Sequence, residues 1–431
     1  MTTTINDYKL DGIYAQRQEG YFMQRVKLPA GVISASQART VAEVSEQFAK
    51  AKLHLTTRGS IEIHWLQEKY LPEVKRRLAT AGLTSRGACG GAVRGITCGS
   101  QGAIGFTQLE AMARRIHRHF TANPRFERLP KKFKVGIEAD TKGKRHLIQD
   151  FGLVLNRLED RCALYDVWVA GGLGREPQPA ILLESEVHED RIIPLIEAVA
   201  RVYEDGTAPG KRLKHLLNKI GEAEFRRLIY AEPTAIELLP PVKGFAETLT
   251  AKDCNPAQRI EAYLFAGQLT AAELEQLADF SDKWSDGTLM LTTDQNVAFQ
   301  ISTDRDRIEA CQTLQEAGFV AADPAEQVRF RVCPGSHECK MGLSPTREIA
   351  AALIASLGEK ITSAAWALSG CHNSCSQSQL ADIGITTSSL TANADGQRTP
   401  RFDIFRGQTD GLGQKAETGL TFEELTATIC R

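Results

Sequence analysis

Four cysteines near the C-terminal end of the chain have a spacing that suits a metal cofactor. Cys333 and Cys339 form a C-x5-C pair, and Cys371 and Cys375 form a C-x3-C pair further along. Glycine, serine and asparagine flank the thiols, so the backbone can approach a cluster closely and direct N–H groups at its sulfur atoms. The pattern favours an iron–sulfur cluster and therefore a redox protein.

Zinc is the main alternative metal for these cysteines. Structural zinc sites commonly have two residues between the cysteines of a pair, or histidine partners at a set spacing, and neither pair here fits well. His337 and His372 lie inside the two cysteine segments, where hydrogen bonding to nearby backbone is favoured over ligation. The sequence thus favours an iron–sulfur cluster over zinc and over unligated thiols.

The overall charge excludes several classes of partner. The chain has 431 residues, with 52 Lys and Arg against 53 Asp and Glu. Such a balance gives no global field for nucleic acid or an anionic membrane, so anion binding must be local.

The N-terminal segment lacks a basic leader, and no run of about eighteen apolar residues occurs. Ten cysteines are too sparse for a disulfide scaffold. We expect a cytoplasmic protein without a membrane span.

The chain contains an internal repeat. Residues 51–66 and 286–301 both read as a strand, a Leu-Thr-Thr turn and a second alternating strand, with a helical pattern before and after. A weaker repeat places Asp150 opposite Asp382, each within Asp-x-Gly. That alignment sets the C-x3-C pair against the segment IEADTKG, which has no cysteine. The repeat predicts a duplicated, pseudo-twofold α+β protein in which only the second half holds the cluster, with the site where the halves meet.

Several motifs together resemble one enzyme family. The C-x5-C pair followed by GC-x-N-x-C, the LTTR turn ahead of GACGGAVRGITC, and the segment LPKKFK resemble the sulfite and nitrite reductases that use siroheme coupled to a 4Fe–4S cluster. The resemblance spans nearly the whole chain. It implies an α+β fold of duplicated ferredoxin-like (parachute) half-domains plus two α/β domains that bind siroheme and cluster.

This fold divides the chain into four expected domains, with a boundary between the halves near EPTAIELLPPVKGF, where three prolines and a glycine interrupt the pattern. The expected ranges are 10–85 for the first ferredoxin-like half-domain, 86–250 for the first siroheme-binding α/β domain with the Arg and Lys anion site, 255–325 for the second half-domain, and 326–431 for the domain that binds the 4Fe–4S cluster and siroheme.

The resemblance also implies roles for the cysteines. Cys333, Cys339 and Cys371 would hold the cluster, and Cys375 would be the shared ligand whose thiolate bridges the cluster and the siroheme iron. The residues expected to contact the cofactors besides these cysteines are Thr57, Arg58, Arg94 and Asn373.

Cations that would bind an anion occur at the matching positions. By the resemblance, the substrate pocket and its catalytic cations comprise Arg58, Arg94, Lys132 and Lys134. Residues two apart on a strand share a face, so the two lysines can point into one cavity while Phe133 packs behind them. KKFK alone is most often a solvated edge strand, and only its occurrence with the cysteine pairs reverses that interpretation. The chain departs from the family at Gly59, Ser60 and Gly95, where relatives commonly have polar residues, which predicts fewer contacts to the macrocycle.

The implied activity is a six-electron reduction of sulfite to sulfide, with electrons passing from the cluster through Cys375 to the siroheme iron. Lys134 and the GACG segment resemble the sulfite branch, and a dianion gains more than nitrite from a fourth cation. Sulfite is therefore favoured, and reduction of nitrite to ammonia is also expected. No Rossmann or flavodoxin-like pattern, and no second ferredoxin-type cysteine run, is present to accept electrons from NAD(P)H. An external donor is implied, either ferredoxin or a flavoprotein subunit.

Three alternatives remain open. They are a nitrite reductase proper, an enzyme like precorrin-3B synthase of cobalamin synthesis, and an iron–sulfur electron carrier without catalysis. The intact cations argue against the second and third.

Overall fold

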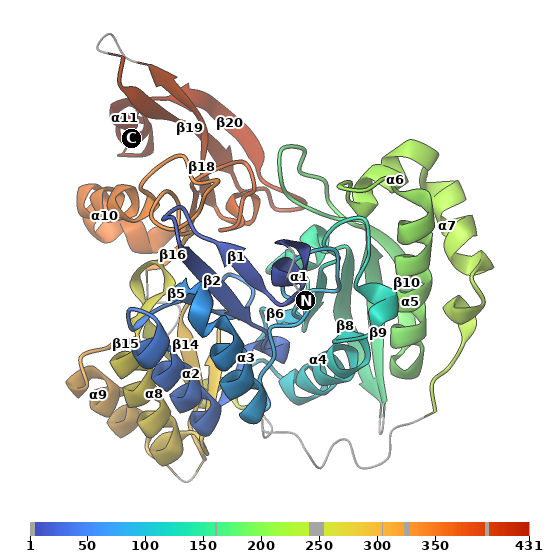
Figure 1. The fold of residues 1–431 in the computed structure, drawn as a ribbon, viewed down its shortest axis with the longest axis horizontal. Coiled ribbons are helices and arrows are strands. Elements are labelled where there is room, and N and C mark those ends of the chain that lie inside the picture. The colour runs from blue at the N-terminus through green and yellow to red at the C-terminus, as the bar shows by residue number, and fades with distance from the viewer. Residues whose placement is uncertain are drawn as a thin grey trace.

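Four five-stranded sheets make up the framework of the protein. The computed structural model describes residues 5–159, 162–240, 254–303, 305–322, 328–392 and 396–430. Figure 1 shows two small sheets with their helices at the lower left, a larger lobe in green at the right, and the cysteine-bearing lobe in orange and red at the top. The segment 241–253, which includes part of the expected boundary near EPTAIELLPPVKGF, lies outside the described residues.

The two small sheets are antiparallel and correspond to the repeat. The first has the strand order β1 (Ile13–Ala15), β2 (Tyr21–Val26), β5 (Ile61–Gln67), β4 (Lys52–Leu55) and β12 (Gln268–Thr270). The second has the order β15 (Val320–Ala322), β11 (Arg259–Tyr263), β14 (Val297–Gln300), β13 (Thr288–Leu291) and β3 (Val32–Ser34). Each sheet therefore takes one edge strand from the other half of the chain. Leu269 pairs with Leu53 in one sheet, and Ile33 pairs with Leu289 in the other.

The helices of these sheets begin in the same way in both halves. They are α2 (Ala35–Phe48), α3 (Leu71–Thr80), α8 (Ala271–Trp284) and α9 (Arg307–Glu316). Each exchanged strand leads directly into a helix through a capping box, formed by Ser34 with Gln37 before α2 and by Thr270 with Glu273 before α8. Such boxes satisfy the free N–H groups of a first turn and fix where the helix starts. Residues of both halves then share one hydrophobic core.

The two larger sheets also repeat one another. The first has the order β10 (Ile181–His188), β9 (Cys162–Val169), β8 (Phe151–Glu159), β7 (Val135–Glu138) and β6 (Thr97–Cys98). The second has the order β16 (Arg329–Val332), β17 (Ala365–Ser369), β18 (Ile383–Ala392), β19 (Arg398–Arg406) and β20 (Gln414–Leu420). In each sheet the first three strands along the chain are parallel and the later pairs are antiparallel.

The weaker repeat is confirmed by equivalent hydrogen bonds. Asp150 accepts a bond from the backbone N–H of Lys134 at 2.8 Å, just before β7. Asp382 accepts one from the N–H of Ala365 at 2.7 Å, at the start of β17. The loop after β17 carries the C-x3-C pair, and the cysteine-free segment after β7 occupies the equivalent place, as the alignment of the aspartates predicts.

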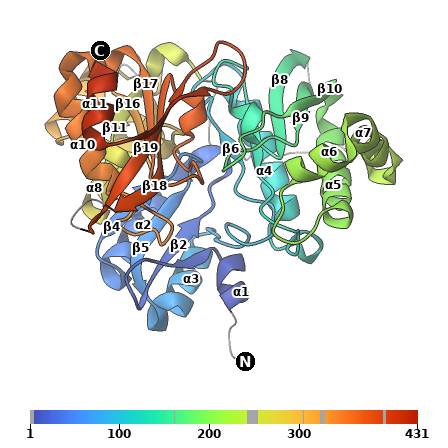
Figure 2. The same ribbon diagram turned by 90° about the horizontal axis from the view of Figure 1, so that it is seen from above.

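Most of the remaining helices flank the larger sheets, whereas α1 contacts β1 of the first small sheet. Figure 2 shows α5, α6 and α7 packed together at one end of the molecule. The remaining helices are α1 (Ile5–Leu10), α4 (Phe106–Phe120), α5 (Glu189–Gly206), α6 (Leu213–Ile220), α7 (Glu222–Ala231), α10 (Thr346–Leu357) and α11 (Phe422–Cys430). Short 3-10 helices are η1 (Pro29–Gly31), η2 (Glu68–Tyr70), η3 (Pro124–Phe126), η4 (Arg145–Ile148), η5 (Pro233–Ile236), η7 (Pro256–Gln258), η8 (Phe265–Gly267), η9 (Gly358–Ser363) and η10 (Ser378–Leu380). Among the described residues, none of these helices combines the length and apolar character needed to cross a membrane.

The exchanged strand β12 is expected to stabilise the half-domain that it enters. Replacing Leu269, which is 3% exposed in the shared core, with alanine should lower the free energy of unfolding by about 2–5 kcal/mol, because the cavity left behind cannot close fully. Val320→Ala is the matched control, since Val320 is also on an edge strand but is 63% exposed. Urea unfolding followed by circular dichroism measures both. Equal losses in the two variants would contradict a stabilising role for β12.

Candidate functional site

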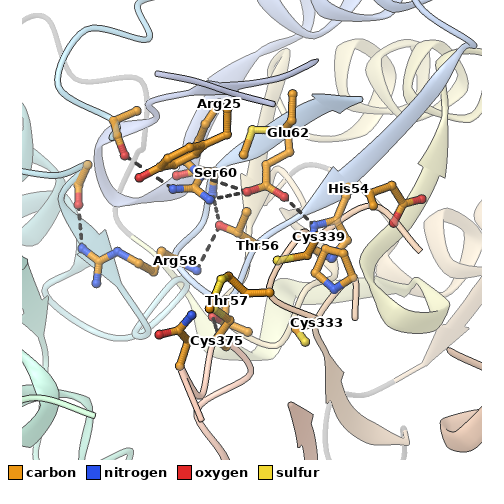
Figure 3. A pocket seen from close by; sticks show the side chains of 18 of the residues that line it. Arg25, His54, Thr56, Thr57, Arg58, Ser60, Glu62, Cys333, Cys339 and Cys375 are labelled. Carbon is orange, nitrogen blue, oxygen red and sulfur yellow. Dashed lines mark hydrogen bonds and ion pairs between the residues drawn. The ribbon is translucent and has the colours of Figure 1, made fainter. Parts of the chain in front are cut away.

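A cavity of about 470 Å³ is lined by residues of both halves. Nine of the ten predicted site residues line it, namely Thr57, Arg58, Arg94, Lys132, Lys134, Cys333, Cys339, Asn373 and Cys375. Figure 3 shows Cys333, Cys339 and Cys375 gathered on one side, with Thr57 beside Cys375. Cys371 does not line the cavity, although its side chain interacts with the other three cysteines.

Two parallel strands bring the cysteine pairs together. Cys333 follows β16 directly, and Cys371 follows β17 after a single glycine. Because β16 and β17 are parallel neighbours, their carboxyl ends meet at the same edge of the sheet. The N–H of Gly370 donates to Cys333 Sγ at 3.1 Å, and the side chain of Asn373 hydrogen-bonds the Cys371 thiol. The strand pairing therefore explains how two distant sequence segments form one thiol group.

The cysteine loops pack backbone against backbone. A Cβ at Gly342 would lie 2.1 Å from the carbonyl oxygen of Gly335, and a Cβ at Gly370 would lie 2.9 Å from Gly335 Cα. Gly335 also has a positive φ of 56°, which glycine adopts most readily. Side chains at these positions would push the two loops apart. The glycines therefore allow the close wrapping that a cluster needs.

The electrostatics of the thiols also fit a cluster. Burial raises the pKa of Cys333, Cys339 and Cys371, and the neighbouring Cys375 raises each further. For Cys371 the pKa rises to about 11. Several thiolates this close together repel one another unless a positive centre lies among them, and bound iron supplies that charge. The donor set thus fits an iron–sulfur cluster.

The LTTR turn of the first half contacts the Cys375 loop directly. Thr57 Oγ1 donates to the carbonyl oxygen of Cys375 at 2.7 Å, and Gln377 Nε2 donates to the carbonyl oxygen of Thr57 at 3.0 Å. Gly59, two residues after Thr57, has a φ of 61°. A Cβ at this position would lie 3.0 Å from both Gly31 Cα and the Leu291 carbonyl oxygen. A glycine at this departure from the family pattern is therefore suited to close packing between the halves.

Arg58 is bound mainly by protein oxygens. Its guanidinium donates to the carbonyl oxygens of Gly95 at 2.8 Å and Val135 at 3.3 Å, and to Gln149 Oε1 at 3.1 Å. Burial, with added repulsion from Arg94, lowers its pKa to about 9. Both terminal nitrogens are thus already engaged, and Arg58 acts on the cavity chiefly through its charge.

Arg94, by contrast, has a donor without an acceptor. One terminal nitrogen donates to the Gly90 carbonyl oxygen at 2.8 Å, whereas the other is buried and has no hydrogen-bond partner. Burial lowers the pKa of this side chain. A buried, unsatisfied guanidinium nitrogen is costly, so its position in the cavity wall suits an anion that accepts its hydrogen bond.

Lys132 and Lys134 both line the cavity, and Phe133 between them is fully buried. The predicted alternation is confirmed, although the three residues precede β7 instead of lying in it. Burial, with Arg212, lowers the pKa of Lys132 to about 8, and burial with Arg58 lowers that of Lys134 well below its usual value. Lys132 can therefore exchange protons near neutral pH, and burial favours the neutral form of Lys134.

Like Arg25, Lys27 is a cavity cation beyond the four that the sequence predicts. Its side chain is buried, and Nζ donates to Thr121 Oγ1 at 2.9 Å. Burial, together with Arg94, lowers its pKa to about 7. It follows β2, two residues after Arg25, so the two cations share a face with the cavity. This spacing of two from Arg25 is the sequence signal that could have identified Lys27.

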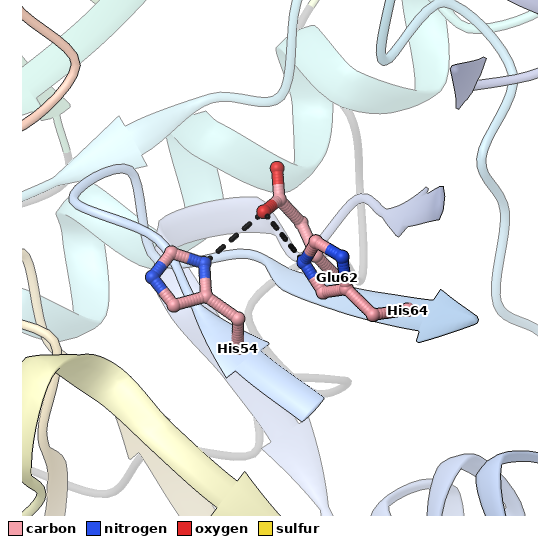
Figure 4. A group of neighbouring side chains, drawn as sticks. All are labelled: His54, Glu62 and His64. Atoms are coloured by element: carbon pink, nitrogen blue, oxygen red, sulfur yellow. Dashed lines mark hydrogen bonds and ion pairs between the residues drawn. The ribbon is translucent and has the colours of Figure 1, made fainter. Parts of the chain in front are cut away.

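A buried group of His54, Glu62 and His64 forms another part of the cavity wall (Figure 4). Glu62 Oε2 lies 3.1 Å from His54 Nδ1 and 3.4 Å from His64 Nε2, and Arg25 Nε donates to Glu62 Oε1 at 3.0 Å. These distances alone would also suit a metal ion. Sequence analysis did not single out these residues, although Glu62 and His64 alternate along β5.

Gln295 extends the hydrogen bonds of this group to the second half of the chain. Its amide nitrogen donates to the carbonyl oxygens of Leu55 at 2.9 Å and Val332 at 3.0 Å, and lies 3.1 Å from His54 Nε2. The ring of His54 thus has a polar neighbour at each nitrogen, Gln295 at Nε2 and Glu62 at Nδ1. This network is a hydrogen-bonded wall of the cavity.

Comparisons with known proteins agree with this site. Residues 14–81 and 261–317 match the model described as the nitrite/sulfite reductase ferredoxin-like half domain, and residues 102–237 match the nitrite and sulphite reductase 4Fe-4S domain. The second match falls on the half of the chain without the four clustered cysteines.

Curated relatives and a solved structure cover most of the chain. "Sulfite reductase (ferredoxin) 1" of Mycolicibacterium paratuberculosis is 25% identical over 95% of this chain and 80% of its own length. "Ferredoxin–nitrite reductase" of Synechococcus elongatus is 29% identical over 94% and 84%. The structure of the NirA protein of Mycobacterium tuberculosis superimposes with a TM-score of 0.84 at 25% identity, over 99% of this chain and 85% of that one. The chain belongs to the siroheme- and 4Fe–4S-dependent nitrite and sulfite reductase family.

Proposed function

We propose that this protein reduces sulfite to sulfide in a six-electron reaction, and nitrite to ammonia as a second activity. The observation that carries this function is the cavity itself, because cluster-type thiols from one half and buried cations from the other line the same space. A reductase of small oxyanions needs thiols to hold the cluster that supplies electrons, and cations to bind the anionic substrate.

The cofactors are a 4Fe–4S cluster and siroheme. Cys333, Cys339, Cys371 and Cys375 would hold the cluster, with Cys375 also a ligand of the siroheme iron, and Thr57 and Asn373 would fix the loop between them. When bound, the two groups supply the electrons and the metal centre at which S–O or N–O bonds are broken. Siroheme carries eight carboxylates, and the cationic wall that includes Arg25 and Lys27 is suited to them.

The protein's own part is to bind the anion and to move protons. Arg94 offers the unpartnered nitrogen, Lys132 adds positive charge, and Lys134 adds a further N–H donor in the same cavity. Arg58 contributes charge while its hydrogen bonds hold neighbouring loops. Lysines with lowered pKa values can donate a proton to an oxygen that leaves the substrate and regain it from water. Fixed donors of this kind stabilise charge that develops in the transition state.

Sulfite is the proposed preferred substrate, because several cations serve a dianion better than a monoanion. Relatives of both kinds match the chain, one named as a sulfite reductase and the other as a nitrite reductase. Both names include ferredoxin, which is the proposed electron donor, with a flavoprotein subunit as the alternative. Nitrite reductase proper is the second candidate function.

The absorption spectrum of the purified, cofactor-loaded protein tests the cofactors. We expect a strong Soret band and a red band from siroheme, over the broad absorption of the cluster. Cys375→Ser should abolish the siroheme bands, because the shared ligand is lost. Cys162→Ser is the control, since Cys162 is at the start of β9 and outside the cavity. A loaded protein without siroheme bands would sink the proposed function and leave the cobalamin-type enzyme or the electron carrier.

Steady-state rates with a reduced viologen dye then test the substrate. We expect kcat/KM to be higher for sulfite than for nitrite, with measurable turnover of both. A higher value for nitrite would assign the protein as a nitrite reductase proper.

The adjacent residues Lys131 and Lys132 allow the effect of a charge in the cavity to be compared with the effect of a charge on the surface. Lys132→Met should lower kcat/KM about a hundredfold, which is the usual loss for one such donor of about 3 kcal/mol. Lys131→Met should have little effect, because Lys131 is exposed and outside the cavity.

The pH dependence of kcat/KM tests the role of Lys132. Since the pKa of Lys132 is lowered to about 8, the side chain is positive below that pH and neutral above it. The kcat/KM for nitrite, whose charge does not change in this range, should fall as pH rises through about 8. Lys132→Arg keeps its charge and should flatten this fall. An unchanged profile in Lys132→Arg would show that Lys132 does not bind the anion.

A further inference from the structure

The Leu-Thr-Thr turn of the second half has a different task from its counterpart in the first. At the position equivalent to Arg58, the second turn has Asp294. Arg58 lines the cavity, whereas Asp294 does not. The Asp294 carboxylate instead binds two guanidinium groups, Arg145 at 3.1 Å and Arg331 at 2.9 Å. The duplicated position therefore carries opposite charge in the two halves.

Arg331 joins this carboxylate to the cluster loop. It lies on β16, two residues before Cys333, and its side chain is 5% exposed. Nε donates to the carbonyl oxygen of Ser376 at 3.0 Å, and a terminal nitrogen donates to that of Gln377 at 3.4 Å. Thr57 holds the carbonyl oxygen of Cys375 itself. Three successive carbonyl groups, beginning at Cys375, are thus fixed by donors from outside the loop.

The next residue of the turn holds the other cysteine segment. Gln295 accepts a hydrogen bond from the N–H of Val332 at 2.7 Å and donates to the Val332 carbonyl oxygen at 3.0 Å. Val332 immediately precedes Cys333. Asp294 and Gln295 therefore hold, directly or through Arg331, the segments that carry the first and last of the four cysteines.

The group also places charge beside the loop. Burial alone would raise the pKa of Asp294, but Arg145 and Arg331 outweigh it and lower the pKa to about 2, so the carboxylate is ionised at neutral pH. Two guanidinium groups and one carboxylate carry one net positive charge among them, and Arg329 and Asp382 add one charge of each sign nearby. The potentials of iron–sulfur clusters depend on nearby charge, hydrogen bonding and exposure. A buried positive charge stabilises the more negative, reduced state.

We propose that Arg331, held in place by Asp294, is a positioning residue that fixes the Cys375 loop and raises the reduction potential of the cluster bound there. The proposal rests on the proposed function, since it requires a cluster at the four cysteines. It goes beyond that function by assigning a second-half ion group to the control of the cofactor's potential.

Redox titration of the holoenzyme, followed by the electron paramagnetic resonance signal of the reduced cluster, tests this role. In Arg331→Met the ratio of reduced to oxidised cluster at a fixed ambient potential should fall at least tenfold, equivalent to about 59 mV for one electron. Arg331→Lys keeps the charge but not the planar fork, and should recover most of the potential while broadening the signal. Asp294→Asn removes a negative charge and should shift the potential upward.

Arg329→Met is the matched control, because Arg329 is two residues earlier on the same strand and its charge, which also acts on Asp294, is exposed and screened by solvent. If Arg331 only stabilised the fold, the Arg331 and Asp294 variants would not shift the reduction potential of the cluster in opposite directions. Equal potentials in Arg331→Met and Arg329→Met would overturn this proposal and leave the proposed function intact. A wild-type protein without cluster and siroheme signals would overturn both. If Arg331→Met does not retain its cluster, Asp294→Asn decides, and a potential equal to wild type in that variant overturns the proposal.

Discussion

The central contact between the halves at the site is the hydrogen bond from Thr57 Oγ1 to the carbonyl oxygen of Cys375, and Arg17 and Gln18 bind carbonyl oxygens of the Cys339 loop in a similar way. Gln377 returns a bond to the same turn, so the LTTR segment and the cluster loop are tied in both directions. This contact places the thiols and the cations around a single cavity. Among the described residues that line the cavity, the cysteines come from the second half and the buried or half-buried cations come from the first, so each half supplies a part that the other does not.

Such a contact needs a framework that does not let the halves rotate. The exchanged strands β3 and β12 provide it, since each completes the sheet of the other half. Capping boxes then fix the start of α2 and α8 directly after these strands, and one hydrophobic core covers both sheets. Sliding one half against the other would break two edge pairings and expose this core. The geometry at Thr57 is thereby determined by packing far from the cavity.

Local pattern was enough to predict part of this structure. The repeat of strand, turn and strand, and the alternation of Lys132, Phe133 and Lys134, follow from periodicity, and the structure has both. Lys27 was not predicted, because its spacing from Arg25 indicates a shared face but its proximity to Arg94 arises only in the fold. Gly59 looked like a lost polar contact, yet its surroundings include Leu291 of the other half. A role that depends on contacts with residues distant in sequence cannot be predicted from the local segment alone.

The two Leu-Thr-Thr turns show how duplication resolves conflicting electrostatic demands. A carboxylate at position 58 would face Arg94 and Lys134 but repel the substrate anion, whereas an arginine at position 294 would repel Arg145 and Arg331. One sequence for both turns would therefore damage either the anion site or the cluster loop. Because the halves are separate copies, Arg58 and Asp294 could take opposite signs while the backbone of the turn stayed the same. The pseudo-twofold axis relates equivalent backbones, and the chemistry of the site comes from the side chains that break that symmetry.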